Sequence, residues 1–278
     1  MFLRNRYNYL ALFFFSYFLF IIYTIYSLQI LNINDSIKKI DEQTLDVFYL
    51  SAPRGEIYDT NSEKLATSSL EPHLFLNLRK INDDNIEQYK QYLKYNFQEL
   101  KNSDFEEIFN SKEILFLIRN IDGLDYLERQ SLLELDAFEI FDYPIRKYNY
   151  ENVASHIIGY IGRPTQEEFE EYPESLKNGI VGKSGIEKYY EEKLSGKAGV
   201  LTFKGSEIID FIAPEAGEDL FLTIDIQTQT IATESLLEGI KLANENFDSE
   251  NIIQKGSVVV IDIDSGEIVS MVSLPDFD

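Results

Sequence analysis

Apolar residues are most concentrated near the N-terminus, where positions 7–31 hold no charged side chain. A run of roughly 20 apolar residues is long enough to cross the hydrocarbon core of a bilayer. Arg4 and Arg6 precede the run, so the positive-inside rule places the N-terminus in the cytoplasm. We predict a cytoplasmic tail over 1–7 and a transmembrane signal anchor over 8–31, with all later residues outside. The alternatives are a buried soluble helix and a cleaved signal peptide, although no Ala-x-Ala site follows the run.

Beyond this run, shorter patterns alternate between strand-like and helix-like periods. Strands are expected over 45–52 and 114–118, and two short strands are expected on either side of the turn formers at 59–62. Capping residues and helical spacing predict helices over 86–100, from 103, over 124–135, from 165 and after Asp225. On the last helix, one face would be lined by Ile231, Leu236, Leu237, Ile240 and Ala243. β-Branched runs on both sides of Asp264–Gly266 predict a hairpin.

The most informative pattern lies at residues 179–199, which we call the junction element. Ser184 and Glu187 have the Ser-x-x-Glu spacing of a capping box at a helix start. An apolar stripe at helical spacing follows, formed by Ile186, Tyr190 and Leu194. Gly196, just past the stripe, can take the left-handed conformation that ends a helix. The pattern alone predicts a short amphipathic helix between glycine-rich turns.

Composition excludes several classes of function. The chain has 278 residues, of which 44% are hydrophobic, enough for one large folded domain or two smaller ones. A formal charge of −23 argues against nucleic-acid binding, because phosphate binding needs clustered Lys and Arg. The absence of Cys excludes disulfides, thiolate zinc sites and a Cys nucleophile. The histidines are limited to His73 and His156, so we expect no histidine metal site and no Ser-His-Asp triad. We also expect no cofactor.

The junction element reads Gly-Lys-Ser-Gly-Ile-Glu-x-x-Tyr-Glu-x-x-Leu-x-Gly-x-x-Gly from Gly182 to Gly199. It resembles the segment that joins a non-catalytic pedestal, the dimerisation domain, to the transpeptidase domain in class B penicillin-binding proteins. The Gly-Lys-Ser-Gly form is closer to the elongation-type branch, penicillin-binding protein 2, than to the division-type branch.

Three further segments resemble this family in the same order. Residues 52–66 match its first pedestal motif at Arg54, Gly55, Ile57, Asp59, Asn61, Leu65 and Ala66. Thr60 and Ser62 replace the usual Arg and Gly, and Ser62 suggests a different turn geometry because serine does not readily take a positive φ. Residues 153–162 and 217–225 match at Ala154, His156, Gly159, Tyr160 and Gly162, and at Gly217-x-x-Leu-x-Leu-Thr-Ile-Asp225.

The resemblance implies an α+β protein with a transmembrane helix, a pedestal domain over 32–217, and only the first helix and β-hairpin of a transpeptidase domain over 218–278. The positions that we single out as structural are Arg54, Gly55, Asp59, Gly182, Gly185, Glu187 and Gly196. The resemblance also implies a single-pass protein of the cytoplasmic (inner) membrane. The intact protein would crosslink peptidoglycan stem peptides, together with a glycosyltransferase and shape-maintenance proteins.

The catalytic elements of this family, Ser-x-x-Lys, Ser-x-Asn and Lys-Thr-Gly, are expected after the hairpin at which this chain stops. Similar short patterns at Ser36–Lys39, Lys183–Gly185 and Ser249–Asn251 stand in the wrong order and are interpreted as chance matches. Asp262 and Asp264 follow a strand as in some phosphotransferases, but too few residues remain for that fold. We therefore predict no catalytic residue. The chain is either a fragment that is inactive alone or a membrane-anchored scaffold that binds wall-synthesis partners.

Overall fold

The computed structural model describes residues 2–26, 45–97, 100–150, 152–168, 175–246 and 252–276. They divide into two compact units, residues 1–46 with 202–209, and residues 47–201 with 210–278. The division predicted from the sequence, into segments 1–7, 8–31, 32–217 and 218–278, stays a prediction. The fold is mixed α+β, as expected.

The first helix, α1, covers Phe2–Tyr26. Within the part of the chain that the structure describes, no helix is both long and apolar enough to cross a membrane. Residues 27–31 of the predicted anchor lie outside the described residues. The transmembrane anchor is therefore not confirmed and stays a prediction.

A five-stranded sheet organises the second unit, with strand order β10-β2-β3-β4 and β5 on the other side of β3. Its strands are β2 (Ile57–Tyr58), β3 (Lys64–Asn77), β4 (Leu115–Asn120), β5 (Phe138–Tyr148) and β10 (Leu220–Phe221). β3 pairs antiparallel with β5 from Ala66↔Tyr148 to Leu76↔Phe138. β10, which follows the junction element after β8 and β9, is parallel to β2, so this sheet combines strands from distant parts of the chain.

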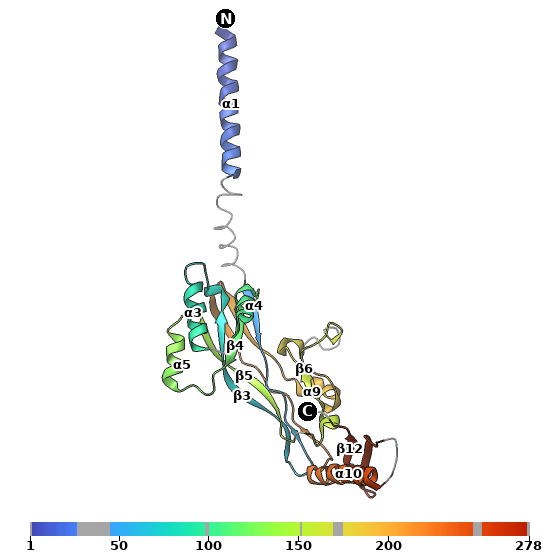
Figure 1. Cartoon of the computed structure of the whole chain (residues 1–278). Helices are drawn as coiled ribbons and strands as arrows, with labels where there is room; N and C mark the ends of the chain where they lie inside the picture. The colour runs from blue at the N-terminus through green and yellow to red at the C-terminus, as the bar shows by residue number, and fades with distance from the viewer. Residues whose placement is uncertain are drawn as a thin grey trace. The chain divides into compact units, whose positions relative to one another are not determined.

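Three helices cover one part of this sheet, α3 (Ile86–Asn96), α4 (Asn102–Asn110) and α5 (Tyr126–Leu133). Figure 1 shows them gathered beside β3, β4 and β5. Their core contains Leu74, Leu76, Tyr89, Leu93, Ile108, Leu132 and Phe138. The helices predicted over 86–100 and 124–135 are confirmed with shorter bounds. The start predicted at 103 is one residue late, because α4 begins at Asn102. The Asp104 carboxylate caps this helix start by accepting the Lys101 N–H at 2.8 Å.

The remaining elements are short, apart from one helix and its hairpin. They are β1 (Leu45–Leu50), the 3₁₀ turns η2 (Leu78–Lys80) and η3 (Ser175–Asn178), α6 (Ser155–Ile158), β6 (Ile161–Gly162), β7 (Val181–Gly182), α8 (Gly185–Tyr189), α9 (Glu191–Leu194), β8 (Gly199–Lys204) and β9 (Glu207–Ile212). β6 pairs with β7, and a three-stranded sheet has the order β1-β8-β9. The helix predicted from 165 falls mostly on residues 169–174, outside the described residues.

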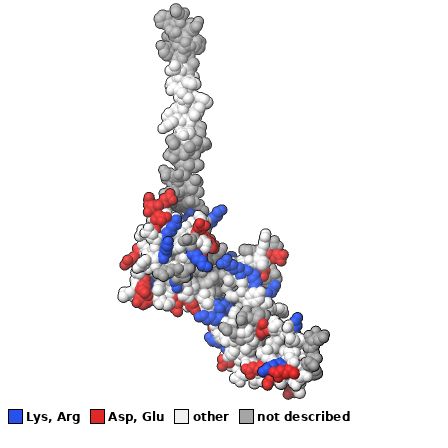
Figure 2. Space-filling view, in the orientation of Figure 1, with Lys and Arg blue, Asp and Glu red and all other residues white. Residues whose placement is uncertain are grey.

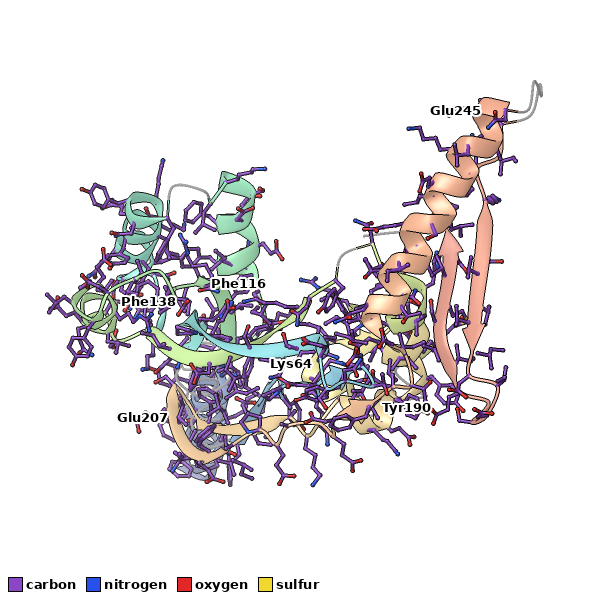
Figure 3. All side chains as sticks on the ribbon, turned by 90° about the horizontal axis from the view of Figure 1, so that it is seen from below. Lys64, Phe116, Phe138, Tyr190, Glu207 and Glu245 are labelled. Atoms are coloured by element: carbon purple, nitrogen blue, oxygen red, sulfur yellow. The ribbon has the colours of Figure 1, made fainter. Side chains whose placement is uncertain are left out.

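The predicted hairpin is confirmed as β11 (Gly256–Ile261) and β12 (Ile268–Leu274), which pair antiparallel. Figure 3 shows α10 (Ile226–Asn246) lying alongside both strands. The predicted face of α10 is partly wrong, because Ile231 and Leu237 are 64% and 53% exposed. The buried residues on this helix are Ile226, Gln229 and Thr233.

Candidate functional site

The junction element forms two short helices, α8 and α9, separated at Tyr190, where φ is −106° and ψ is 27°. The predicted stripe is confirmed, since Leu194 is fully buried and Ile186 and Tyr190 pack against the same core. The predicted capping box is wrong. Ser184 is the N-cap residue but makes no side-chain capping bond, and its buried hydroxyl has no partner among the described residues.

Glu187 is absent from that cap because its carboxylate pairs with arginine. Arg54 donates its Nε–H to Glu187 Oε2 at 2.9 Å, and its Nη2 lies 2.9 Å from the same oxygen. The other edge of the guanidinium binds both oxygens of Glu191, at 2.8 and 3.3 Å. The first family motif and the junction element are thereby joined by a two-carboxylate clamp on one buried arginine.

A second arginine completes the group. Arg146, on β5, donates its Nε–H to Glu187 Oε1 at 2.8 Å and an Nη1–H to the Gly55 carbonyl oxygen at 2.8 Å. We call Arg54, Arg146, Glu187 and Glu191 the charge cluster. Its side chains are at most 2% exposed, and its two positive and two negative charges balance. Balance matters because an uncompensated ion in a protein interior costs several kcal/mol.

The pKa values of Arg54 and of the neighbouring Tyr148 are both shifted from their ordinary values. Burial by itself would lower the pKa of Arg54, but hydrogen bonds and attraction from Glu191 and Glu187 outweigh burial and raise it. Burial, and then the Glu187 charge, raises the pKa of the Tyr148 phenol, which donates to Glu187 at 3.4 Å. Tyr148 therefore stays protonated.

Glycines let the backbone reach this cluster. A Cβ on Gly182 would lie 2.1 Å from the Glu187 carbonyl oxygen, and one on Gly55 would lie 1.9 Å from that of Glu218. The Gly182 N–H donates to Glu191 at 2.8 Å, which a shifted backbone would lose. Gly185 and Gly196 take left-handed φ angles of +57° and +66°, so the helix end predicted at Gly196 is confirmed.

Asp59 does not join the charge cluster but organises the turn after β2. It is fully buried, and its Oδ1 accepts the N–H groups of Asn61 and Glu63, each at 2.8 Å. Its Oδ2 accepts the N–H of Ile226, the first residue of α10, at 3.1 Å. Ser62 takes a φ of +67°, the conformation that glycine favours, so the different turn geometry expected there is wrong.

Two buried amides, Asn178 and Gln229, could not be singled out from the sequence, because single Asn and Gln residues carry no periodic signal. Asn178 is 1% exposed, accepts the Ala52 N–H at 2.7 Å and donates to the Ser195 carbonyl oxygen at 2.9 Å. Gln229 is also 1% exposed and bonds α10 to β12. The predicted capping role of Asp225 is confirmed by a 2.7 Å bond from the Thr228 N–H.

The short patterns that resemble catalytic elements have other roles where they are described. Lys183 pairs with Glu168, and this hydrogen bond lowers the pKa of Glu168 to about 2. Asp262 accepts the N–H groups of Asp264 and Ser265 within the hairpin turn. Ser36 and Ser249 lie outside the described residues. Across the described ranges, no group of three or more His, Asp or Glu residues could hold a metal ion.

On the face that Figure 2 shows, acidic and basic side chains are interspersed. The net charge of −23 is therefore not gathered into a single patch on that face.

Comparison with known proteins places this geometry in a family. The peptidoglycan D,D-transpeptidase MrdA of Escherichia coli K12 is 25% identical over 279 residues, covering 93% of this chain and 41% of that protein. Penicillin-binding protein 3 of Bacillus subtilis is 26% identical over 246 residues, covering 86% of this chain and 34% of that protein. The chain thus spans about two fifths or less of the length of these relatives.

A solved complex between penicillin-binding protein 2 and MreC from Helicobacter pylori has the same fold, with a TM-score of 0.61 at 23% identity. The match covers 84% of this chain and 43% of that one. The family model of the penicillin-binding protein dimerisation domain matches residues 49–208, more than half of the chain. The resemblance predicted from the motifs is confirmed, and the chain belongs to the family of proteins with a penicillin-binding protein dimerisation domain.

Proposed function

We propose that this chain is the anchor and pedestal part of an elongation-type peptidoglycan D,D-transpeptidase. The observation that carries the proposal is the charge cluster, in which Arg54 of the first motif clamps Glu187 and Glu191 of the junction element. Motif residues that pair in the interior support a structural role for the pedestal. This chain spans about two fifths of the length of MrdA. Acyl transfer to stem peptides would belong to a part of the protein that corresponds to the rest of that relative.

Labelling with a fluorescent penicillin tests this division of labour. The chain of residues 1–278, with full-length MrdA of Escherichia coli as the positive control, is expected to take up no covalent label. Stoichiometric labelling of the 278-residue chain would contradict the proposal, because it would require a reactive serine within it. Reading the gene beyond the codon for Asp278 separates the two forms of the proposal. An in-frame Ser-x-x-Lys supports a fragment, and a stop codon supports a stand-alone scaffold.

We also propose that α1 anchors the chain in the cytoplasmic membrane, with its N-terminus in the cytoplasm. The apolar side chains described between Leu12 and Tyr23 are exposed, as lipid-facing side chains would be. Because the chain has no Cys, a cysteine introduced at one position is the only thiol in the protein. A membrane-impermeant maleimide added to intact spheroplasts should label Tyr126→Cys and leave Asn5→Cys unlabelled. The reverse pattern, or release of the chain into the soluble fraction, would contradict the anchor.

A shape-maintenance partner is proposed by analogy with the Helicobacter pylori complex with MreC. A candidate surface is a cavity of about 290 Å³ in the second unit, whose mixed lining combines apolar residues such as Phe48, Phe75 and Leu117 with charged residues such as Glu113, Arg163 and Lys177. Leu117→Asp should weaken binding of the MreC protein from the organism that makes this chain. Leu127→Asp, on the exposed face of α5, is the matched control. Equal binding of both variants would remove this surface from the proposal.

A further inference from the structure

The side chain of Gln229 makes every hydrogen bond that an amide can make. Its Nε2 donates to the carbonyl oxygens of Val153 and Met271, at 2.8 and 2.9 Å. Its Oε1 accepts from the Ser270 hydroxyl and from the Met271 N–H, both at 2.8 Å. A primary amide has two N–H donors and one oxygen with two lone pairs, so its capacity is filled.

The pair of bonds to Met271 imitates a neighbouring strand. One residue in an antiparallel ladder exchanges both its N–H and its carbonyl with a single partner, and here the partner is a side chain. Two further backbone carbonyl groups of β12 also accept hydrogen bonds from the segment that leads into α10. The Ile268 carbonyl accepts from the Thr223 hydroxyl at 2.7 Å, and the Val269 carbonyl accepts the Asp225 N–H at 2.9 Å. The start of α10 therefore closes this edge of β12.

The third segment held by Gln229 belongs to the pedestal. Val153 packs against the core that contains Leu194 of the junction element. Three residues further on, His156 places its Nε2 3.0 Å from the Pro275 carbonyl oxygen, just past the end of β12. The segment 153–156 therefore contacts the hairpin region at both ends, once through Gln229 and once directly.

We propose that Gln229 is a positioning residue, a side-chain latch that fixes β12 against segment 153–156 so that the pedestal core and the hairpin move as one body. Apolar packing between α10 and the hairpin also contributes, since Val272 is 2% exposed, but Ile231, Leu237 and Val259 are exposed and add little to it. The latch goes beyond the proposed function, since it depends on contacts of this chain and on no catalytic step.

Hydrogen exchange of the full 278-residue chain, followed by NMR, tests the latch. Gln229→Leu removes all four bonds, and Gln229→Glu keeps the acceptor but loses both donors near neutral pH. Gln227→Leu is the matched control, because Gln227 is exposed on the same helix two residues away. We expect the Met271 amide to exchange about tenfold faster in Gln229→Leu, less so in Gln229→Glu, and within about twofold of wild type in the control.

Equal Met271 exchange in wild type and Gln229→Leu would overturn the proposal, as would equal acceleration by Gln227→Leu. A second readout guards against a variant that fails to fold. In the wild-type chain, the side-chain NH₂ protons of Gln229 should exchange at least about tenfold more slowly than those of Gln227, because only the former are buried and bonded. Similar rates for the two side chains would contradict the latch directly.

Discussion

Two of the regions in the second unit that bury polar groups, the junction element and the α10–hairpin region, do so by different physical means. The junction element is held by four charges, Arg54, Arg146, Glu187 and Glu191, that compensate one another. The α10–hairpin region is held by a neutral amide, Gln229, and by backbone bonds. A charged cluster depends on every member being present, because loss of one leaves an unpaired ion. Replacing a neutral amide removes only its own hydrogen bonds, so a single substitution should cost more stability at the junction element than at Gln229.

The largest expected effect is the removal of one charge from the cluster. Arg54→Met should lower the free energy of unfolding by roughly 3–5 kcal/mol, because Glu187 and Glu191 would remain buried without their shared partner. Urea unfolding followed by circular dichroism and tyrosine fluorescence measures the change, since the chain has 18 Tyr and no Trp. Lys188→Met, on the exposed face of α8, is the control and should change little. Equal effects of both variants would erase the contrast between the regions.

The next effect concerns backbone approach. Gly182→Ala places a Cβ 2.1 Å from the Glu187 carbonyl oxygen and should cost about 1–3 kcal/mol or more of stability. Gly239→Ala is the opposite control, because Gly239 lies inside α10 with no neighbouring atom within 4 Å of an added Cβ. That variant should gain roughly 0.5–1 kcal/mol, since glycine weakens a helix interior. The two alanine variants should therefore shift the unfolding midpoint in opposite directions.

A smaller effect is expected at the start of α10. Asp225→Ala removes the helix cap and should cost about 1 kcal/mol. Hydrogen bonding from the Thr228 N–H is the main cause that lowers the pKa of Asp225 below its ordinary value. A lowered carboxyl pKa stabilises the fold above the unfolded pKa, so this contribution should be lost below about pH 4. The stability difference between wild type and Asp225→Ala should shrink as the pH falls through that range, and a difference independent of pH would contradict the assignment.

The smallest effect is expected at the surface. Lys197 and Glu215 lie 2.7 Å apart, but their side chains are 79% and 68% exposed. Water and salt screen such a pair, so Lys197→Ala should leave the unfolding midpoint within experimental error of wild type. A clear loss of stability in this variant would show that burial is not what separates strong from weak ion pairs in this chain.

Most helices, several strands and the family could be predicted from the sequence, whereas strands β5, β8 and β9 were not predicted and the contacts of the site could not be. Periodicity predicted the helices around Leu93 and Leu132 and the hairpin, and the motifs singled out Arg54, Gly182 and Glu187. Their pairing was hidden because Arg54 and Glu187 are 133 residues apart. The local Ser184–Glu187 spacing predicted a capping box instead. That box does not form, because Glu187 pairs with two buried arginines from distant parts of the chain.

The region after the junction shows the complementary limit. A polar Gln229 on an amphipathic helix looks like a surface residue, while Ile231 looks like a core residue, and the structure reverses both. Burial of a polar side chain depends on partners such as Val153 and Met271, which come from other elements. Local pattern carries no information on those partners, so the latch becomes visible only once the three segments are brought together.

A double-mutant cycle between Arg54 and Glu187 tests most directly the claim that the charge cluster joins the first motif to the junction element. Unfolding free energies are measured for wild type, Arg54→Met, Glu187→Met and the double variant. If the two residues act as one buried unit, the double variant should cost less than the sum of the single variants, with a coupling energy of about 2 kcal/mol. Costs that add to within about 0.5 kcal/mol would contradict the account, because the two side chains would then stabilise the fold independently.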